Sequence, residues 1–277
     1  MPHWLLSDGT PLYYEDAGAG PVVVFVPGWT FTTRVWTRQT TALADRFRVI
    51  ACDLRGAGRS GKTPAGHGFS RYAKDLHELF VGLNLKDITL VGWAMGATVA
   101  MHYMALGDVV GRVERLIWVD HSPRFYALSD WPFALYGSLT PETLERTLDQ
   151  LLADRPGATN ALMDDIFSEG IGDEDRHAFY TDSFMTPTSV AVRMLGSAAA
   201  TDLRPYLGSL RLPCLFVNGA RSVVPSGVGR WMAGQVVSGR HAVLEEAGHA
   251  PFWDQPRQFN ALVEEFIATS TKNIEVA

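Results

Sequence analysis

The sequence has few cysteines, no surplus of positive charge and no long apolar run. Its two cysteines, Cys52 and Cys214, each lie in or beside a short apolar run typical of a buried strand. A disulfide framework and a cysteine-based metal site are therefore not expected. The 24 Lys and Arg against 30 Asp and Glu give a formal net charge of −6, which leaves no excess of cations for a phosphate backbone. Nucleic acid is not an expected partner.

Membrane spans and leader segments are also not indicated. Apolar runs such as residues 22–26 are far shorter than the roughly 20 residues needed to cross a bilayer. Residues 1–7 lack a basic start followed by a long apolar stretch. With 47% hydrophobic residues in a chain of 277, we expect a cytoplasmic protein with a sizeable core and no membrane contact.

Short apolar runs and helical patterns alternate along most of the chain. The runs cover residues 12–15, 22–26, 47–52, 88–91, 116–119, 214–217 and 242–245, and the helical patterns cover residues 71–83, 95–105, 227–236 and 257–268. Several runs are apolar throughout, which suits strands covered on both faces. The alternation predicts an α/β fold with a mostly parallel central sheet flanked by helices.

From about residue 121 to residue 206 this alternation stops. The segment has the pattern of consecutive helices, predicted over residues 140–154, 158–168, 173–184 and 188–199. We predict a core of residues 1–120 and 207–277 and an all-helical lid of residues 121–206. The lid is expected to cover the carboxyl ends of the strands, where open sheets bind ligands.

Residues 88–97 run from a buried strand into Gly92-Trp93-Ala94-Met95-Gly96 and then into a helix. This is the layout of a nucleophile elbow, in which glycines permit a sharp turn that presents the central side chain to the site. Here the central side chain is the methyl group of Ala94. An ordinary strand–helix turn with glycines at tight positions is the alternative.

His249 lies in the loop after the last predicted strand, residues 242–245. A single histidine is most often a solvated or hydrogen-bonded surface residue. His249 differs because it completes the chain order of nucleophile, acid and histidine found with such elbows. It is our candidate general base.

Together these segments resemble the α/β-hydrolase superfamily, most closely its small bacterial esterase, lactonase and cofactor-free haloperoxidase-like members. The matching stretches are Pro27-Gly28-Trp29, residues 35–39, 53–60, 92–96 and 119–123, and residues 248–252. They span nearly all of the chain outside the lid. The resemblance implies an α/β-hydrolase fold and no metal or organic cofactor.

The resemblance also implies a set of site residues. The serine nucleophile of the family falls on Ala94, and its oxyanion donors fall on the backbone N–H groups of Met95 and Trp29. Ser222 stands at the commonest place of the acid and cannot offset an imidazolium charge. Some members carry the acid after the preceding strand of the sheet, which selects Asp120.

Other roles for these carboxylates stay open at this stage. Asp120 also suits a strand-end residue that caps its own loop. Asp202 and Asp254 are weaker candidates for the acid, because neither ends a predicted strand that faces the pocket.

Three explanations compete for Ala94. They are an engineered serine-to-alanine substitution made to trap a substrate, a natural pseudoenzyme that only binds its ligand, and an enzyme in which His249 acts directly as a general base. The last has relatives in the superfamily, cofactor-free ring-cleaving dioxygenases with a His–Asp pair, and extends to lyase-like chemistry. We favour the substitution, because drift would be expected to change more of the site than the nucleophile alone.

The expected ligand is a small apolar ester or lactone, hydrolysed through an acyl-enzyme when serine occupies the elbow. Aromatic residues near the motifs, Trp93, Trp131, Phe252 and Trp253, are candidate substrate contacts, although such residues more often pack in a core or lid. A small molecule is the expected partner, and a homo-oligomer is left open.

Residues 56–63, Gly-Ala-Gly-Arg-Ser-Gly-Lys-Thr, match the phosphate-binding P-loop pattern in full. That mechanism requires a helix that begins at the Gly-Lys-Thr end and points its N–H groups at the phosphates. Residues 65–68, Ala-Gly-His-Gly, would break such a helix within one turn. Nucleotide binding is therefore a remote alternative.

Overall fold

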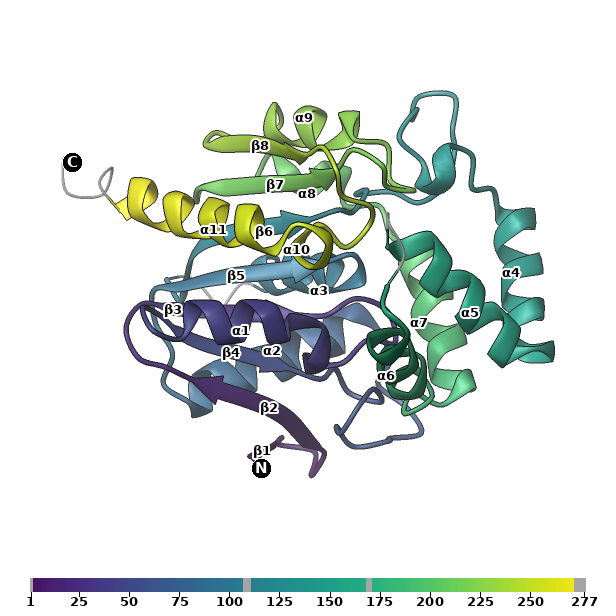
Figure 1. Ribbon diagram of the computed structural model, residues 1–277, viewed down its shortest axis with the longest axis horizontal. Coiled ribbons are helices and arrows are strands. Elements are labelled where there is room, and N and C mark those ends of the chain that lie inside the picture. The colour runs from purple at the N-terminus through teal and green to yellow at the C-terminus, as the bar shows by residue number, and fades with distance from the viewer. Residues whose placement is uncertain (1, 107–110, 168–170, 272–277) are drawn as a thin grey trace.

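The computed structural model describes residues 2–106, 111–167 and 171–271. These residues include one eight-stranded sheet with the order β1-β2-β4-β3-β5-β6-β7-β8 (Figure 1). The strands are β1 (His3–Leu5), β2 (Pro11–Ala17), β3 (Val22–Val26), β4 (Arg48–Cys52), β5 (Ile88–Trp93), β6 (Val113–Val119), β7 (Cys214–Gly219) and β8 (Gly239–Leu244). Strands β3 to β8 are parallel, and β1 and β2 pair antiparallel at one edge. The predicted mostly parallel α/β sheet is confirmed.

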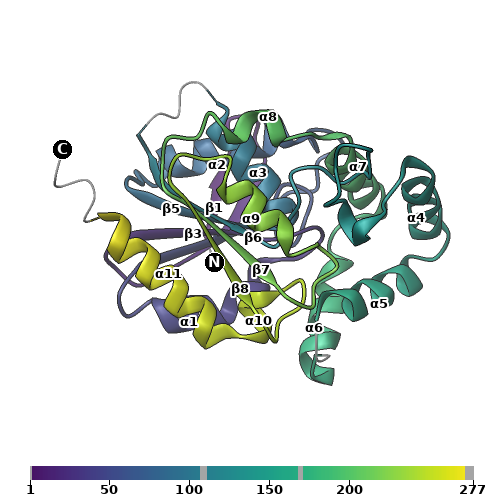
Figure 2. The same ribbon diagram turned by 90° about the horizontal axis from the view of Figure 1, so that it is seen from above.

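Helices cover both faces of this sheet (Figure 2). Helices α1 (Thr37–Leu43), α10 (Pro251–Asp254) and α11 (Pro256–Thr271) lie on one side, and α2 (Phe69–Gly82), α3 (Met95–Met104) and α9 (Gly227–Ala233) lie on the other. Side chains alternate across a strand, so Val24 and Val26 of β3 enter the cluster under α2 and α3, whereas Val23 and Phe25 enter the other. The continuous apolar runs thus reflect burial on both faces.

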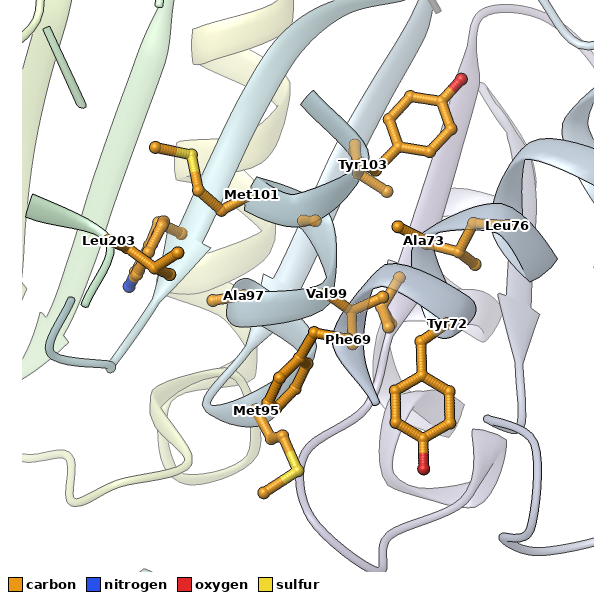
Figure 3. Packing of buried hydrophobic residues seen from close by; sticks show 14 of the residues in the cluster. Phe69, Tyr72, Ala73, Leu76, Met95, Ala97, Val99, Met101, Tyr103 and Leu203 are labelled. Atoms are coloured by element: carbon orange, nitrogen blue, oxygen red, sulfur yellow. The ribbon is translucent and has the colours of Figure 1, made fainter. Parts of the chain in front are cut away.

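Helix α3 is buried on nearly all sides. Eight of its ten residues are buried, and it packs against both β5 and α2. Figure 3 shows the cluster in which Met95 and Val99 of α3 and Leu76 of α2 lie. Because α3 begins directly after Ala94, this packing holds the end of β5 in a fixed position.

All seven predicted strands are present, with ends that differ by up to three residues. The short elements β1, α1, α10 and α8 (Arg204–Leu207) were not predicted. Their sequences are too brief to show a hydrophobic period, and helix α1, Thr-Arg-Gln-Thr-Thr-Ala-Leu, is mostly polar.

Between β6 and β7 the described residues form the short helix α8 and four longer helices, and the longer ones lie beyond the carboxyl ends of the strands (Figure 1). They are α4 (Pro141–Ala153), α5 (Arg155–Ile166), α6 (Asp173–Ser183) and α7 (Thr188–Ala200). The expectation of an all-helical segment is wrong for residues 121–140, which form loops with one short 3-10 turn, Leu135–Gly137, because Pro and Gly interrupt them. Helix α5 starts at Arg155 rather than residue 158, and its predicted end at Ser168 lies outside the described residues.

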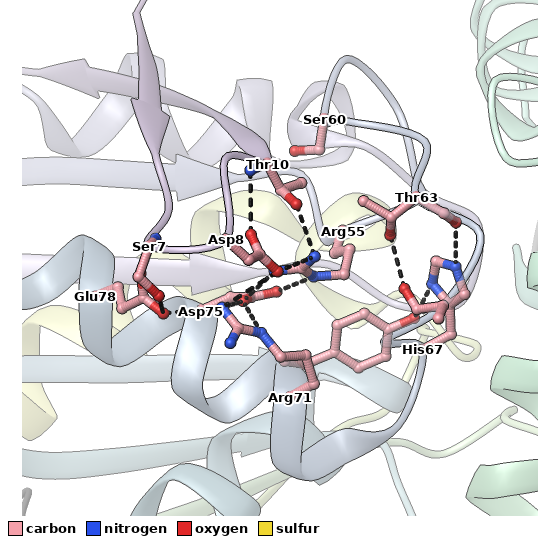
Figure 4. A network of polar contacts seen from close by, with 12 residues as sticks. Ser7, Asp8, Thr10, Arg55, Ser60, Thr63, His67, Arg71, Asp75 and Glu78 are labelled. Atoms are coloured by element: carbon pink, nitrogen blue, oxygen red, sulfur yellow. Dashed lines mark hydrogen bonds and ion pairs between the residues drawn. The ribbon is translucent and has the colours of Figure 1, made fainter.

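A buried ion-pair network ties the loop after β4 to helix α2 (Figure 4). Arg55 donates two hydrogen bonds of 2.8 Å to the carboxylate of Asp75, and both side chains are almost completely buried. The same guanidinium contacts Thr10 at 2.8 Å and Asp8 at 2.7 Å. The network fixes the start of α2 against the sheet edge.

We expect Asp75→Asn to lower the free energy of unfolding by about 3 kcal/mol, because it leaves the buried Arg55 guanidinium without its main counter-charge. Glu78→Gln on the same helix is the matched control. Glu78 pairs with Arg71 nearer the surface, so its loss should cost less than about 1 kcal/mol. Urea unfolding monitored by tryptophan fluorescence measures both. Equal losses for the two variants would contradict this reading of the network.

Candidate active site

Ala94 forms the turn between β5 and α3 in a backbone conformation that alanine rarely adopts. Its φ is 48° and its ψ is −119°, a region strained for any residue with a Cβ. A Cβ atom at Gly96 would overlap the carbonyl oxygen of Val26, and one at Gly92 would overlap the carbonyl oxygen of Gly96. The close approach of β3, β5 and α3 therefore requires both glycines, and the strained turn between them presents Ala94 to a cavity.

Ala94→Gly is expected to raise the free energy of unfolding by about 1 kcal/mol, because glycine adopts a positive φ without strain. Ala97→Gly is the control, since Ala97 lies within α3, where glycine costs about 1 kcal/mol. Chemical unfolding of the two variants should therefore shift in opposite directions. Destabilisation by both would show that the elbow is not strained at Ala94.

His249 and Asp120 meet beside the elbow. The Nδ1 atom of His249 lies 2.7 Å from Oδ2 of Asp120, which is fully buried. The other carboxylate oxygen accepts hydrogen bonds from the backbone N–H of Gly219 at 3.0 Å and from Asn218 Nδ2 at 3.1 Å, and the Ser222 hydroxyl donates to Oδ2. These donors orient the carboxylate toward the imidazole, 129 residues further along the chain.

The backbone of His249 is held from two sides. Its N–H donates to the carbonyl oxygen of Ile166 at 2.9 Å, and its own carbonyl oxygen accepts from Trp93 Nε1 at 2.7 Å. With Nδ1 directed at Asp120, Nε2 is the ring nitrogen left for the cavity that His249 lines. This is the arrangement in which a histidine accepts a proton from a nucleophile or from a substrate.

The other carboxylates considered for the acid are engaged elsewhere. Asp202 pairs with Arg124 at 2.7 Å and with Arg204 at 2.8 Å. Asp254 accepts from the backbone N–H of Gly248 at 2.7 Å. Of the three, Asp120 is the one that contacts His249.

The support that Ser222 gives to Asp120 was not predicted from the sequence, where Ser222 was considered only as a residue unable to replace the acid. Because β7 lies next to β6 in the sheet, the loop after β7 reaches the carboxylate that follows β6. A hydroxyl in the loop after one of two adjacent parallel strands was the signal available.

The cavity above Ala94 has a volume of about 460 Å³ and a mostly apolar wall. Core residues line its base, and α4, α5, α7 and the loop before α4 line its upper part. The larger apolar lining residues are Trp29, Phe31, Trp93, Met95, Phe125, Leu135, Leu139, Leu144, Leu151, Leu162, Ile166, Leu195 and Val223. Within the described lining, Asp165 is the one Asp or Glu, and there is no Lys or Arg. The site therefore suits a compact apolar molecule without negative charge.

Of the four aromatic residues predicted to contact the substrate, one is among the described cavity lining. Trp93 lines the cavity, whereas Trp131, Phe252 and Trp253 are absent from the described lining. Phe252 is fully buried beneath Trp93 at a ring distance of 5.0 Å. Trp253 packs on Phe179 at 4.8 Å, and Trp131 packs edge-on against a tryptophan of α9. These three rings pack against neighbouring residues and do not line the cavity. Their spacing in the sequence could not predict this, because it does not show which helix each ring packs against.

The two candidate oxyanion donors lie at the base of the cavity. Met95 is the first residue of α3, so its N–H has no acceptor within the helix. Trp29 follows β3 and lines the same cavity. Its indole Nε1 also donates to the carbonyl oxygen of Ala191 in α7 at 2.9 Å, which connects the loop after β3 to the helices above.

The P-loop interpretation of residues 56–63 is wrong. The described residues 61–68 contain no helix, and α2 begins only at Phe69. The Lys62 ammonium donates to the carbonyl oxygens of Ala57, Gly58 and Ser60. The lysine thus closes its own loop, and the helix that would hold a phosphate is missing.

Two features are absent from the described ranges. None of the helices there is both long enough and apolar enough to cross a membrane. No group of three or more His, Cys, Asp or Glu side chains with the geometry of a metal site occurs in residues 2–106, 111–167 and 171–271.

Known proteins resemble this chain along nearly its whole length. A pimeloyl-[acyl-carrier protein] methyl ester esterase from Aeromonas hydrophila is 32% identical over 261 residues, which cover 91% of this chain and 98% of the esterase. A non-heme chloroperoxidase from Kitasatospora aureofaciens is 27% identical over 257 residues, 90% of this chain and 92% of the peroxidase.

Solved structures show the same fold. An esterase from Exiguobacterium antarcticum has a TM-score of 0.90 at 24% identity, covering 96% of this chain and 98% of its own. An enol-lactonase from Burkholderia xenovorans LB400 has a TM-score of 0.81 at 20% identity, covering 96% of this chain and 100% of its own. The model of the alpha/beta hydrolase family matches residues 23–262. The chain belongs to the α/β-hydrolase family.

Proposed function

We propose that this chain carries the site of an ester or lactone hydrolase that lacks only its nucleophilic oxygen. The observation that carries the proposal is the strained elbow at Ala94, kept beside the His249–Asp120 pair at the base of one cavity. An alanine in a strained conformation contributes nothing chemical of its own. The same backbone would present a serine hydroxyl to His249.

Each group has a role in the form with serine at the elbow. The hydroxyl would pass its proton to His249 Nε2 and attack the carbonyl carbon, while Asp120 holds the imidazole tautomer and stabilises its charge. The N–H groups of Met95 and Trp29 would stabilise the oxyanion. Water would then hydrolyse the acyl-enzyme. With Ala94 the chain binds the ester and forms no acyl-enzyme.

The proposed substrate is a small apolar ester or lactone. The apolar wall and the absence of Lys and Arg from the described lining support a neutral ligand. Relatives named as esterases, a methyl ester esterase and an enol-lactonase support this bond type. We treat residues 121–206 as the lid that selects among such ligands, because α4, α5 and α7 supply the upper wall of the cavity.

A panel of p-nitrophenyl esters and lactones tests the proposal. Quenching of tryptophan fluorescence measures which compounds bind the chain with Ala94. The compounds that bind should be recovered unhydrolysed. The Ala94→Ser variant should hydrolyse the same compounds. The absence of turnover by Ala94→Ser with bound compounds would reject the hydrolase site.

We favour a serine-to-alanine substitution as the origin of Ala94. The elbow backbone, the His249–Asp120 contact and the start of α3 at Met95 all remain, whereas drift in a pseudoenzyme would be expected to alter several of them. A cytoplasmic location stays a prediction, and a homo-oligomer stays open.

A second candidate function uses His249 without a nucleophile. Its Nε2 faces the cavity while Nδ1 is held by Asp120, so the pair is placed to remove a proton from a carbon or hydroxyl acid. Oxygen consumption with acidic hydroxyaromatic compounds, lost in His249→Gln, would support this function. No consumption by the chain with Ala94 would reject it.

A further inference from the structure

His121 is a second histidine of the cavity, and neither proposed reaction uses it. It follows Asp120 directly, is 2% exposed and belongs to the cavity lining. Its ring packs edge-on against Phe125 at 5.0 Å and lies 5.8 Å from the ring of Trp118, whose Nε1 donates to the His121 carbonyl oxygen at 3.0 Å. These contacts fix the orientation of the imidazole.

Thr98 fixes which ring nitrogen of His121 carries the proton. Thr98 Oγ1 lies 2.7 Å from His121 Nε2, and both side chains are buried. Within the described part of the chain, the hydroxyl of Thr98 makes no other hydrogen bond. If Nε2 donated, the buried hydroxyl proton would have no acceptor, which is costly. The hydroxyl therefore donates to Nε2, and Nε2 is the unprotonated nitrogen.

The imidazole of His121 is neutral. Burial, together with the nearby His249, lowers the pKa of His121 to about 3. A neutral imidazole carries one N–H. Since Nε2 accepts from Thr98, that proton resides on Nδ1, the nitrogen available to a molecule in the cavity.

We propose that His121 is a substrate-binding residue that donates a hydrogen bond from Nδ1 to an oxygen atom of the bound ligand. This inference rests on the proposed function, in which the cavity holds an ester or lactone. The reacting carbonyl oxygen is assigned to the backbone donors of Met95 and Trp29. A ligand that satisfies these two backbone donors and His121 Nδ1 therefore carries a second acceptor, such as a keto, ether or hydroxyl oxygen, because a buried donor left unpaired weakens binding.

The tautomer is tested first, on the chain as it exists. Nitrogen-15 NMR of histidine-labelled protein should show a neutral His121 protonated at Nδ1 throughout pH 5 to 8. The His121→Phe spectrum assigns its resonances. Thr98→Val removes the donor to Nε2 and should release the preference for this tautomer. A neutral His121 protonated at Nε2, or an imidazolium in this pH range, would overturn the proposal.

Ligand binding tests the contact itself. Ethyl 3-oxo-3-phenylpropanoate and ethyl 3-phenylpropanoate differ by one keto oxygen, and the chain with Ala94 should bind both without forming an acyl-enzyme. Relative to the parent, His121→Phe should weaken binding of the keto ester about five- to tenfold more than binding of the other ester.

His102→Phe is the matched control. His102 lies on α3, stacks on Phe69 at 5.5 Å and is absent from the described cavity lining. The ratio of the two dissociation constants should not change in this variant. An unchanged ratio in His121→Phe would overturn the contact. A changed ratio there, with no ester hydrolysis by Ala94→Ser, would reject the hydrolase function and keep the His121 contact.

Discussion

Ala94→Ser should increase kcat for p-nitrophenyl butanoate by at least about 10³-fold. Removal of the triad serine lowers kcat by a factor on the order of 10⁶ in a serine protease. We expect a smaller change here, because the cavity need not position this ester ideally. The physical basis is the elbow backbone, which would place the new hydroxyl where the Ala94 methyl group now faces the cavity beside His249. Initial rates of p-nitrophenolate release measure the change.

Two variants control for this gain. Ala94→Gly has the same elbow without a hydroxyl and should stay at the rate of the parent chain. Ala94→Ser combined with His249→Gln retains the hydroxyl without its base and should lose nearly all of the gain. Activity in Ala94→Gly would show that release of strain, rather than a nucleophile, produces the rate.

In the Ala94→Ser background, Asp120→Asn should lower kcat by up to about 10⁴-fold, with the rate of the parent chain as the floor and little change in KM. The corresponding amide in a serine protease stabilises the wrong imidazole tautomer and has an effect of this size. Asp120 is suited to the same role because its Oδ2 lies 2.7 Å from His249 Nδ1. Steady-state kinetics separate this loss of kcat from a loss of binding.

Asp202→Asn in the same background is the control. Asp202 forms ion pairs with Arg124 and Arg204, so its amide should leave kcat nearly unchanged. Circular dichroism shows whether each variant folds. A folded Asp120→Asn variant with full kcat would assign the acid to another group.

The sequence predicted the parts of the site that depend on strand order. Asp120 directly follows β6 and Ala94 directly follows β5, and the carboxyl ends of parallel neighbours meet at one edge of a sheet. Their proximity therefore follows from the pattern of apolar runs. The glycines around Ala94 predicted a tight turn, and the overlap of a Cβ atom with neighbouring carbonyl groups explains both of them.

The cavity wall could not be predicted in the same way. Phe252 and Trp253 lie in the helix after the His249 loop, and their rings point into packing against Trp36 and Phe179. The direction of these side chains depends on where α10 packs against the rest of the chain. The hydrophobic periodicity of so short a segment does not predict that position. The contact between Thr98 and His121 joins a helix to a strand end and likewise appears only when α3 is packed on the sheet.

The segment between β6 and β7 could also be predicted only in part from the sequence. Helix-start signals such as Thr140-Pro141 placed α4 to within one residue, since the Thr140 side chain caps that helix. Residues 121–139 carry no such signal and form loops that depend on contacts with distant parts, such as the bridge between Arg124 and Asp202. Local sequence therefore predicts the helices of this segment better than its connections.

The most direct test of the proposed hydrolase site is covalent labelling by a fluorophosphonate, followed by mass spectrometry of the peptide that contains residue 94. We predict one phosphonyl adduct on this peptide in Ala94→Ser, its loss when His249→Gln is added, and no adduct in the chain with Ala94. An unlabelled, folded Ala94→Ser variant would contradict the proposal that only the nucleophilic oxygen is missing.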